Sequence, residues 1–297
     1  YAPQAEIQRY LERVAHDFGI VGQIRLNTRV EDARWDAAAA RWRITTAGGE
    51  VYSARFFIPA AGYIGEAKMP HFPGQDTFQG AVFHSGLWNH DYDLRGKRVA
   101  VIGTGASGVQ AITEIAKTVG HLTVFQRTPN WCTPLRNSAI APEEMEKIRA
   151  RYDEIFAQCR DNWGCFIHTA DPRHATEVTP EERDAFFEEL YNMPGFAFWQ
   201  GNFRDVLMDQ TANDALTQFV IKKIRARVKD QKLADKLIPT NHGYGTRRVP
   251  LESGYFEVYN QSNVKLVDLR ETPIERITEK GLKTSDAEYE FDMIIYA

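Results

Sequence analysis

The sequence predicts an α/β protein built around a parallel sheet, and three patterns support this. An apolar run at 97–102 is followed by a glycine-rich turn, a helical pattern at 109–119 and a second apolar run at 122–126. This order is the start of a parallel βαβ unit. Short candidate strands precede it and follow it, and a charged stretch with helical periodicity lies between it and the later strands. We therefore expect antiparallel meanders on both sides of a dinucleotide-binding unit.

The N-terminal part is expected to contain one helix and one meander. In Ala5–Phe18 the apolar residues recur at helical spacing. Candidate strands lie at 24–30, 41–46 and 50–53, with an apolar run at 54–60. Residues 66–80 are rich in Pro and Gly and are predicted to be a connector.

The C-terminal part is expected to be helical first and then to return to strands. Candidate helices lie at 143–159, 180–191, 212–228 and 230–237, and candidate strands at 264–268, 274–278, 282–284 and 291–297. The segments 56–62 and 293–297 both follow a meander and both resemble a buried strand that ends in Ala. This weak similarity predicts that two meanders flank an inserted dinucleotide-binding domain.

Composition excludes several classes of protein. A net charge of -4 over 297 residues gives no general attraction to nucleic acid or to an anionic membrane surface. The three cysteines form no CxxC pair, so neither a redox dithiol nor a zinc ribbon is predicted, and no metal site is expected. We expect a reducing, cytoplasmic setting. Because the sequence starts at Tyr1 and stops within an apolar run, we also expect an internal fragment of a longer protein.

The clearest candidate site is the motif GxGxxG at Gly103–Gly108. It stands directly after a predicted strand and before a predicted helix, which is the context that dinucleotide binding requires. Gly103 permits a tight turn, Gly105 removes a side chain where a pyrophosphate must approach, and Gly108 allows close packing of helix and strand. The free amides and the positive end of the helix would then face the phosphates. The alternative is a glycine-rich turn without a ligand.

The end of the second strand predicts which nucleotide is bound. NAD-specific sites usually have an acidic residue here, but this sequence has Arg127 and Thr128. A forked cation and a hydroxyl both suit a 2′-phosphate, which favours NADPH over NADH. The alternative for Arg127 is an ordinary solvated charge.

Residues 78–89 resemble the fingerprint of the Baeyer–Villiger monooxygenases, FxGxxxHxxxW followed by Pro or Asp. Phe78, Gly80, His84 and Trp88 match it, whereas Asn89 departs from the final position. Related flavin-containing monooxygenases have Tyr or Phe in place of Trp88. Further matches occur in family order over nearly the whole chain: GTGASG, FQRTPNW, Gly245-Thr-Arg-Arg-Val-Pro-Leu251, NVKLVD and the closing FDMIIYA.

The resemblance implies two Rossmann-like domains, in which an FAD domain is interrupted by an NADPH domain with a helical insert. On this basis we expect residues 1–80 to belong to the FAD domain, 81–245 to form the NADPH domain, and 246–297 to return to an incomplete FAD domain. It also implies that FAD, NADPH and O2 insert one oxygen atom next to a ketone carbonyl to give an ester or lactone. The N-terminal FAD phosphate loop and an acidic partner of the active-site arginine should lie upstream of Tyr1, so we expect the chain alone to be inactive.

The resemblance also assigns roles to single residues. Arg248 matches the active-site arginine, and Arg247 matches a position that contacts the 2′-phosphate. The alternative for Arg248 is an ordinary surface arginine. His84 and Trp88 match the hinge between the domains, where His84 has a conformational or structural role rather than that of a general base.

Other matched positions are predicted to contact the cofactors. Within the turn the contacts come from Gly103, Thr104, Gly105, Ala106, Ser107 and Gly108. Gln110 is expected near the nicotinamide half, and Asn130 and Trp131 are expected to line the cofactor groove; core is the alternative for Trp131. Val30, Ala61 and Gly62 are expected near FAD; Ala61 replaces a residue that usually carries a hydroxyl, and plain core is the alternative for Val30.

Three functions remain open from the sequence. The first is a Baeyer–Villiger monooxygenase acting on a small-molecule ketone. The second is an N- or S-oxygenating flavin-containing monooxygenase. The third is a nucleotide-binding module without turnover, against which the Arg247–Arg248 pair argues. The sequence names neither the ketone nor the oligomeric state.

Overall fold

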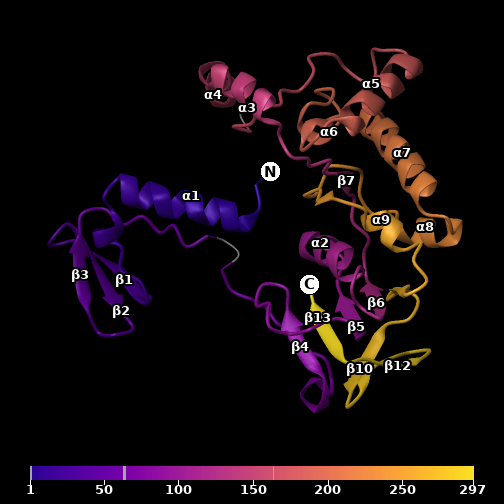
Figure 1. The fold of residues 1–297 in the computed structure, drawn as a ribbon, viewed down its shortest axis with the longest axis horizontal. Coiled ribbons are helices and arrows are strands. Elements are labelled where there is room, and N and C mark those ends of the chain that lie inside the picture. The colour runs from indigo at the N-terminus through magenta and orange to yellow at the C-terminus, as the bar shows by residue number, and fades with distance from the viewer. Residues whose placement is uncertain (1, 63–64, 163) are drawn as a thin grey trace. The chain divides into compact units, whose positions relative to one another are not determined.

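The structure is a computed structural model that describes residues 2–62, 65–162 and 164–297. It divides into an N-terminal unit, up to Glu66, and a C-terminal unit from Ala67 to Ala297. Figure 1 shows the elements of both units. Each unit is described by itself below.

The N-terminal unit contains one long helix and one antiparallel meander. It comprises α1 (Gln4–Asp17), the short 3-10 helix η1 (Val21–Gln23), β1 (Val30–Asp36), β2 (Arg41–Thr46) and β3 (Val51–Ala54). Within β1 and β2, Trp35 lies opposite Trp42 and their rings meet edge to face with centroids 5.8 Å apart. The meander is confirmed, but its first strand lies later than predicted, because Asn27 has a positive φ of 52° that interrupts an extended chain and the tryptophan pair sets the register.

The apolar run at 54–60 does not form the buried strand expected at 56–62, because β3 ends at Ala54. Phe56 is 77% exposed and Ile58 is 84% exposed, and no neighbouring strand pairs with them among the described residues. The expected repeat of 56–62 and 293–297 is therefore wrong in its first copy. The helix α1 also has no buried residue in this unit, although its apolar side chains share one face.

The C-terminal unit is organised around a five-stranded parallel sheet in the order β4-β13-β5-β6-β9. The strands are β4 (Ala81–His84), β5 (Arg98–Ile102), β6 (His121–Gln126), β9 (Val264–Asp268) and β13 (Met293–Tyr296). Val99, Ala100 and Val101 are fully buried, as expected for a strand covered on both faces. The predicted α/β class with a parallel sheet is confirmed.

The predicted helices form, except that the one expected at 143–159 is divided in two at Arg151, and two short helices of four residues each are additional. Several helices begin at clear capping residues. They are α2 (Ala106–Ile115), α3 (Pro142–Ala150), α4 (Tyr152–Asp161), α5 (Pro180–Asn192), α6 (Ala197–Gln200), α7 (Gln210–Arg227), α8 (Gln231–Leu237) and α9 (Tyr255–Val258). Thr179 and Glu182 form a capping box at α5, and Asp209 and Asp230 cap α7 and α8. Helices α5 to α7 gather at one end of this unit, away from β10–β12 (Figure 1).

Smaller elements complete the unit. They are η2 (Gln75–Thr77), β7 (Thr133–Pro134), β8 (Leu251–Glu252), β10 (Ile274–Thr278), β11 (Gly281–Thr284) and β12 (Glu288–Glu290). Strands β10 to β12 form the second meander, but its membership differs from the prediction: β12 is additional, and the candidate strand at 264–268 is β9 of the parallel sheet. Strands β7 and β8 form a separate parallel pair.

The predicted domain boundaries need two corrections. Residues 246–297 do not leave the nucleotide-binding unit, because β9 pairs with β6 and β13 inserts between β4 and β5. Residues 67–80 also belong to this unit, since the ring of Phe72 stacks on that of Tyr296 and Gln79 donates a backbone hydrogen bond to Glu279. The sequence predicts both segments in the FAD domain. Neither a connector nor a meander has a local sequence pattern that indicates which sheet it packs against.

Candidate functional site

The glycine-rich turn lies where the strand order of the sheet reverses. From β5 the chain proceeds to β6 and β9 on one side, whereas β13 lies on the other side of β5. In open parallel sheets, ligands bind at the carboxyl ends of strands at such a switch point. Gly103–Gly108 follows β5 directly, so the fold presents this turn at the expected position.

The three motif glycines have distinct surroundings. Gly103 has a φ of +113°, and a Cβ there would lie 2.0 Å from the carbonyl oxygen of Ala297. A Cβ at Gly108 would lie 2.5 Å from the carbonyl oxygen of Gly103, whereas a Cβ at Gly105 would have no atom within 4 Å. Gly103 and Gly108 are therefore required by backbone packing. Gly105 instead leaves open space at the mouth of the turn, which suits the close approach of a pyrophosphate.

The start of α2 is available to bind an anion. Its N-cap is Gly105, and no side chain caps its first amides. Ser107 and Gln110 are exposed, and the Oγ1 atom of Thr104 donates to the carbonyl of Thr128 at 2.9 Å. The free amides can thus donate hydrogen bonds to phosphate oxygens. Thr104 uses its hydroxyl to tie the turn to the end of β6.

The end of β6 carries an uncommitted cation. Gln126 is fully buried, but the next residue, Arg127, is exposed and has no hydrogen-bond or ion-pair partner in the described part of the chain. Thr128 is half-buried beside it. Arg127 and Thr128 therefore follow the end of β6, and Thr128 lies beside the turn, as predicted. Trp131 is 1% exposed and belongs to the core, which decides between its two predicted roles.

The segment 241–248 is held by buried and partly buried hydrogen bonds with distant residues. Trp131 donates to the carbonyl of His242 at 3.0 Å, and Asn213 donates to the carbonyl of Tyr244 at 2.9 Å. The amide of Tyr244 donates to Thr217 at 3.0 Å. These anchors were not identified from the sequence, because they lie 27 to 111 residues from their partners and no local pattern indicates them.

Arg247 and Arg248 follow these anchors and are both exposed. Among the residues that the structure describes, neither side chain has a hydrogen-bond or ion-pair partner. The next residue, Val249, is 2% exposed and begins the path into β8. The structure thus presents two free guanidinium groups on a fixed backbone.

The fingerprint residues surround β4. A Cβ at Gly80 would lie 2.6 Å from the carbonyl oxygen of Asp292, so glycine is required at this position. His84 ends β4, and its Nδ1 accepts from the amide of Gly86 at 3.0 Å. Trp88 packs edge to face against Phe83, with ring centroids 6.0 Å apart. These contacts agree with a structural histidine and a packing tryptophan.

The positions expected near FAD lie in the N-terminal unit. Val30 is 48% exposed and starts β1 rather than ending a strand, so plain core is excluded for it in this unit. Ala61 and Gly62 are exposed, and a Cβ at Gly62 would meet no atom within 4 Å. The contacts of these three residues with FAD stay predictions.

An apolar cavity of about 730 Å³ lies within the helical insert. Its walls include Trp199, Phe203, Leu207 and Met208. A Cβ at Gly245 would lie 2.7 Å from Leu207 Cδ2 and 3.2 Å from Trp199 Nε1, so the cavity borders the arginine segment. The Nε1 of Trp199 is buried and has no hydrogen-bond partner within the described chain. No pattern in the sequence indicates this cavity.

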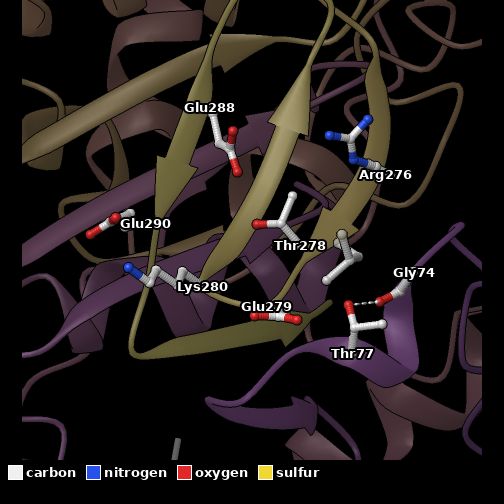
Figure 2. Close-up of a pocket in the computed structure, with 9 residues that line it drawn as sticks. Gly74, Thr77, Arg276, Thr278, Glu279, Lys280, Glu288 and Glu290 are labelled. Atoms are coloured by element: carbon white, nitrogen blue, oxygen red, sulfur yellow. Dashed lines mark hydrogen bonds between the residues drawn. The ribbon is translucent and has the colours of Figure 1, made fainter.

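A second hollow, of about 700 Å³, lies beside the second meander (Figure 2). It is lined by charged side chains, among them Arg276, Glu279 and Glu288, and Thr77 donates to the carbonyl of Gly74 at 2.7 Å. Its residues directly precede β4 and β13, which places it at the amino ends of the sheet. Ligands of such sheets bind at the opposite, carboxyl ends, so this hollow is separate from the nucleotide site.

Comparison with known proteins agrees with this geometry. Residues 1–184 match the family described as pyridine nucleotide-disulphide oxidoreductase. The chain is 47% identical, over its whole length, to 2-oxo-Delta(3)-4,5,5-trimethylcyclopentenylacetyl-CoA monooxygenase of Pseudomonas putida, of which it covers 56%. It is 38% identical to cyclopentanone 1,2-monooxygenase of Comamonas sp. (strain NCIMB 9872), with 99% of the chain and 54% of that protein covered.

A solved structure shows the same fold. The crystal structure of OTEMO in complex with FAD and NADP is 47% identical and superimposes with a TM-score of 0.96, which covers 100% of this chain and 57% of that one. The chain thus spans about half the length of the relatives it matches. The chain belongs to the pyridine nucleotide-disulphide oxidoreductase family, and its relatives include a Baeyer-Villiger monooxygenase of Pseudooceanicola batsensis that is 35% identical over 100% of the chain and 54% of that protein.

In the part of the chain that the structure describes, no helix is both long and apolar enough to cross a membrane.

Proposed function

We propose that this chain forms the NADPH-binding part of an FAD-dependent Baeyer–Villiger monooxygenase. The observation that carries the proposal is the turn at Gly103–Gly108, which lies at the switch point with open space at Gly105 and an uncapped helix behind it. The relatives and the fingerprint at residues 78–88 support the branch of the family. We expect the protein in the cytoplasm, where its cysteines would stay reduced.

The residues of this chain would divide the binding of NADPH between them. The amides of Gly103–Gly108, including those of Ala106 and Ser107, would bind the pyrophosphate, and Gln110 would lie nearer the nicotinamide. Arg127, Thr128 and Arg247 would bind the 2′-phosphate, because guanidinium groups donate to phosphate oxygens in pairs. The free state of the Arg127 and Arg247 side chains supports this role.

Arg248 is proposed as the active-site arginine. When bound, FAD reduced by NADPH supplies the reaction with O2, from which one oxygen atom enters next to a ketone carbonyl and the other leaves as water. Arg248 would hold negative charge that develops on the reacting oxygen atoms, and a well-aimed donor of this kind contributes about 3–4 kcal/mol. Val30, Ala61 and Gly62 are proposed to contact FAD. His84 and Trp88, with Phe78 and Gly80, are proposed to act at the hinge.

The cavity beside Gly245 suits the hydrocarbon part of a ketone. It has the size of typical small-molecule sites, and its walls are mostly apolar. Because it borders the segment that carries Arg248, a ketone held there would lie near the proposed charge. We expect other parts of the complete protein to contribute to the same site.

The test uses the complete protein that contains this chain. We expect it to oxidise NADPH faster than NADH when a ketone is present, and to form a product that is heavier by one oxygen atom. Arg127→Gln should narrow the preference for NADPH. Products that carry oxygen on nitrogen or sulfur would support the alternative class of flavin monooxygenase, and nucleotide binding without turnover would contradict an enzyme.

A further inference from the structure

Arg227, the last residue of α7, is engaged through every N–H group that it has. Its Nη1 and Nη2 donate to the two carboxylate oxygens of Glu252 at 2.8 and 3.0 Å. Its Nε and Nη2 donate to Glu257 at 2.6 and 2.7 Å, and Nη1 also donates to the hydroxyl of Tyr191 at 3.3 Å. An arginine has five N–H donors, so all of them are used. We call Arg227, Glu252 and Glu257 the clamp.

Glu252 is the central residue of the clamp. Its side chain is fully buried, while that of Arg227 is 18% exposed. Its Oε2 also accepts from the amides of Gly254 at 2.7 Å and Tyr255 at 2.8 Å, at the start of α9. Burial alone would lower the pKa of Arg227, but its bonds to Glu257 and Glu252 outweigh this and raise it. Arg227 therefore stays charged, and α7, β8 and α9 meet at the carboxylate of Glu252.

The clamp connects the two halves of the nucleotide site. Both β8 and α9 pack against α2, which is the helix that follows the glycine-rich turn. Glu252 is also the last residue of β8, whose partner β7 follows β6. Arg248 stands only four residues before Glu252, on a stretch where Val249 is buried. The exposed Arg248 thus lies on a stretch of chain that ends at Glu252, and Glu252 is bonded to the largely buried Arg227.

We propose that Arg227 is a positioning residue, which acts through Glu252 to hold Arg248 in place relative to the phosphate-binding turn. The inference rests on the proposed function, since Arg248 acts only if the protein uses NADPH and oxygen. A lysine at position 227 would keep the charge but could not bond both carboxylates in the same fork. The position of Arg248 would then relax while the buried charge stays balanced.

The first test is a double-mutant cycle in the complete, FAD-containing protein with Arg227→Lys and Arg248→Ala. Because small misplacements of catalytic groups are costly, we expect Arg227→Lys to lower kcat about tenfold, with a change in KM for NADPH of less than about threefold. We expect the double variant to be no slower than Arg248→Ala alone, since Arg227 acts through Arg248. Additive losses, or no loss of kcat in Arg227→Lys, would overturn the inference.

The control is Arg225→Lys, on the same helix, where Arg225 forms an exposed ion pair with Asp235. It should leave kcat unchanged. If Arg227→Lys fails to fold, Glu252→Gln serves as the second variant. It keeps the shape of the side chain, removes its charge and should give the same non-additive cycle.

A second readout separates this inference from the proposed function. Hydrogen exchange followed by mass spectrometry should show faster exchange at residues 246–252 in Arg227→Lys, and unchanged exchange in β10 and β11 and in Arg225→Lys. This holds whatever substrate the enzyme oxidises. Equal exchange in Arg227→Lys and wild type would overturn the inference, even if the wild type oxygenates ketones. A wild type that oxidises no ketone would instead overturn the proposed function.

Discussion

The two parts of the candidate nucleotide site are built in opposite ways. The turn at 103–108 is shaped by backbone atoms alone, because Gly103 and Gly108 pack against carbonyl groups and leave no room for a side chain. The arginine segment at 247–248 is shaped by side chains from far away, through Asn213, Thr217 and the clamp. One part depends on the absence of side chains and the other on their presence.

This difference separates stability from function at single residues. A substitution at a packed glycine must disturb the fold, because the obstructing atom is a carbonyl of the backbone itself. A substitution at an exposed arginine without partners should leave the fold intact and change only what the site does. Substitutions of Arg248, Gly103 and Gly105 test this separation.

The largest effect is expected for Arg248→Ala in the complete protein. It should lower kcat roughly a hundredfold or more, which corresponds to about 3 kcal/mol of lost stabilisation of the transition state. Its melting temperature should stay within a degree or two of wild type, because an exposed side chain without partners contributes little to folding. Steady-state kinetics and thermal denaturation check both points, and a large loss of stability would break the comparison.

Gly103→Ala, in contrast to Arg248→Ala, is expected to lower the stability of the fold. The new Cβ would approach the carbonyl of Ala297, and alanine is strained at a φ of +113°. We expect a loss of about 3 kcal/mol in the free energy of unfolding, measured by chemical denaturation. Stability equal to wild type would show that the turn is less rigid than its packing indicates.

Gly105→Ala is the matched control within the same turn. Its φ of -69° suits any residue and the position of the new Cβ is open, so stability should not change. The methyl group would instead occupy the space proposed for the pyrophosphate. We expect NADP⁺ to bind about tenfold more weakly, or about 1.4 kcal/mol, measured by fluorescence titration. Unchanged affinity would argue against this turn as the phosphate site.

Much of the fold could be predicted because its signals are local. The run at 97–102, the motif at 103–108 and the helix after it each follow from neighbouring residues, as do the capped helices α5, α7 and α8. What could not be predicted depends on long-range pairing. Nothing near residues 293–296 indicates that they insert between β4 and β5, so the domain boundary at 246 was misplaced.

The residues of the candidate site divide in the same way, into those that a local motif predicts and those that depend on long-range packing. Gly103, Gly105, Arg127 and Arg248 were identified from motifs or from a family resemblance. The clamp was missed because Arg227 and Glu252 are 25 residues apart and each looks like an ordinary charged residue on a surface. Burial alone distinguishes them, and burial is decided by the packing of α7 against α9.

The smallest effect is expected for Asp268→Asn, at the end of β9. Burial raises the pKa of Asp268, but hydrogen bonds from the side chain and the amide of Arg270, which include one of 2.6 Å from Nη2 to Oδ2, outweigh this and lower it. A folded-state pKa below the unfolded value of about 3.9 means that the stabilisation is complete at neutral pH and is lost as the pH falls through the folded value. Because Arg270 is 44% exposed and the pair is partly screened, we expect only about 1 kcal/mol.

Denaturation of wild type and Asp268→Asn between pH 7 and pH 3 measures this difference, and Asp91→Asn, at an exposed aspartate, is the control. The two unfolding free energies should converge as the solution becomes acidic, and added salt should narrow the gap at pH 7. The pair joins residues two apart in sequence and reaches solvent, unlike the clamp, which joins distant elements through the fully buried carboxylate of Glu252. A pH-independent gap would show that Asp268 stabilises β9 through its shape rather than its charge.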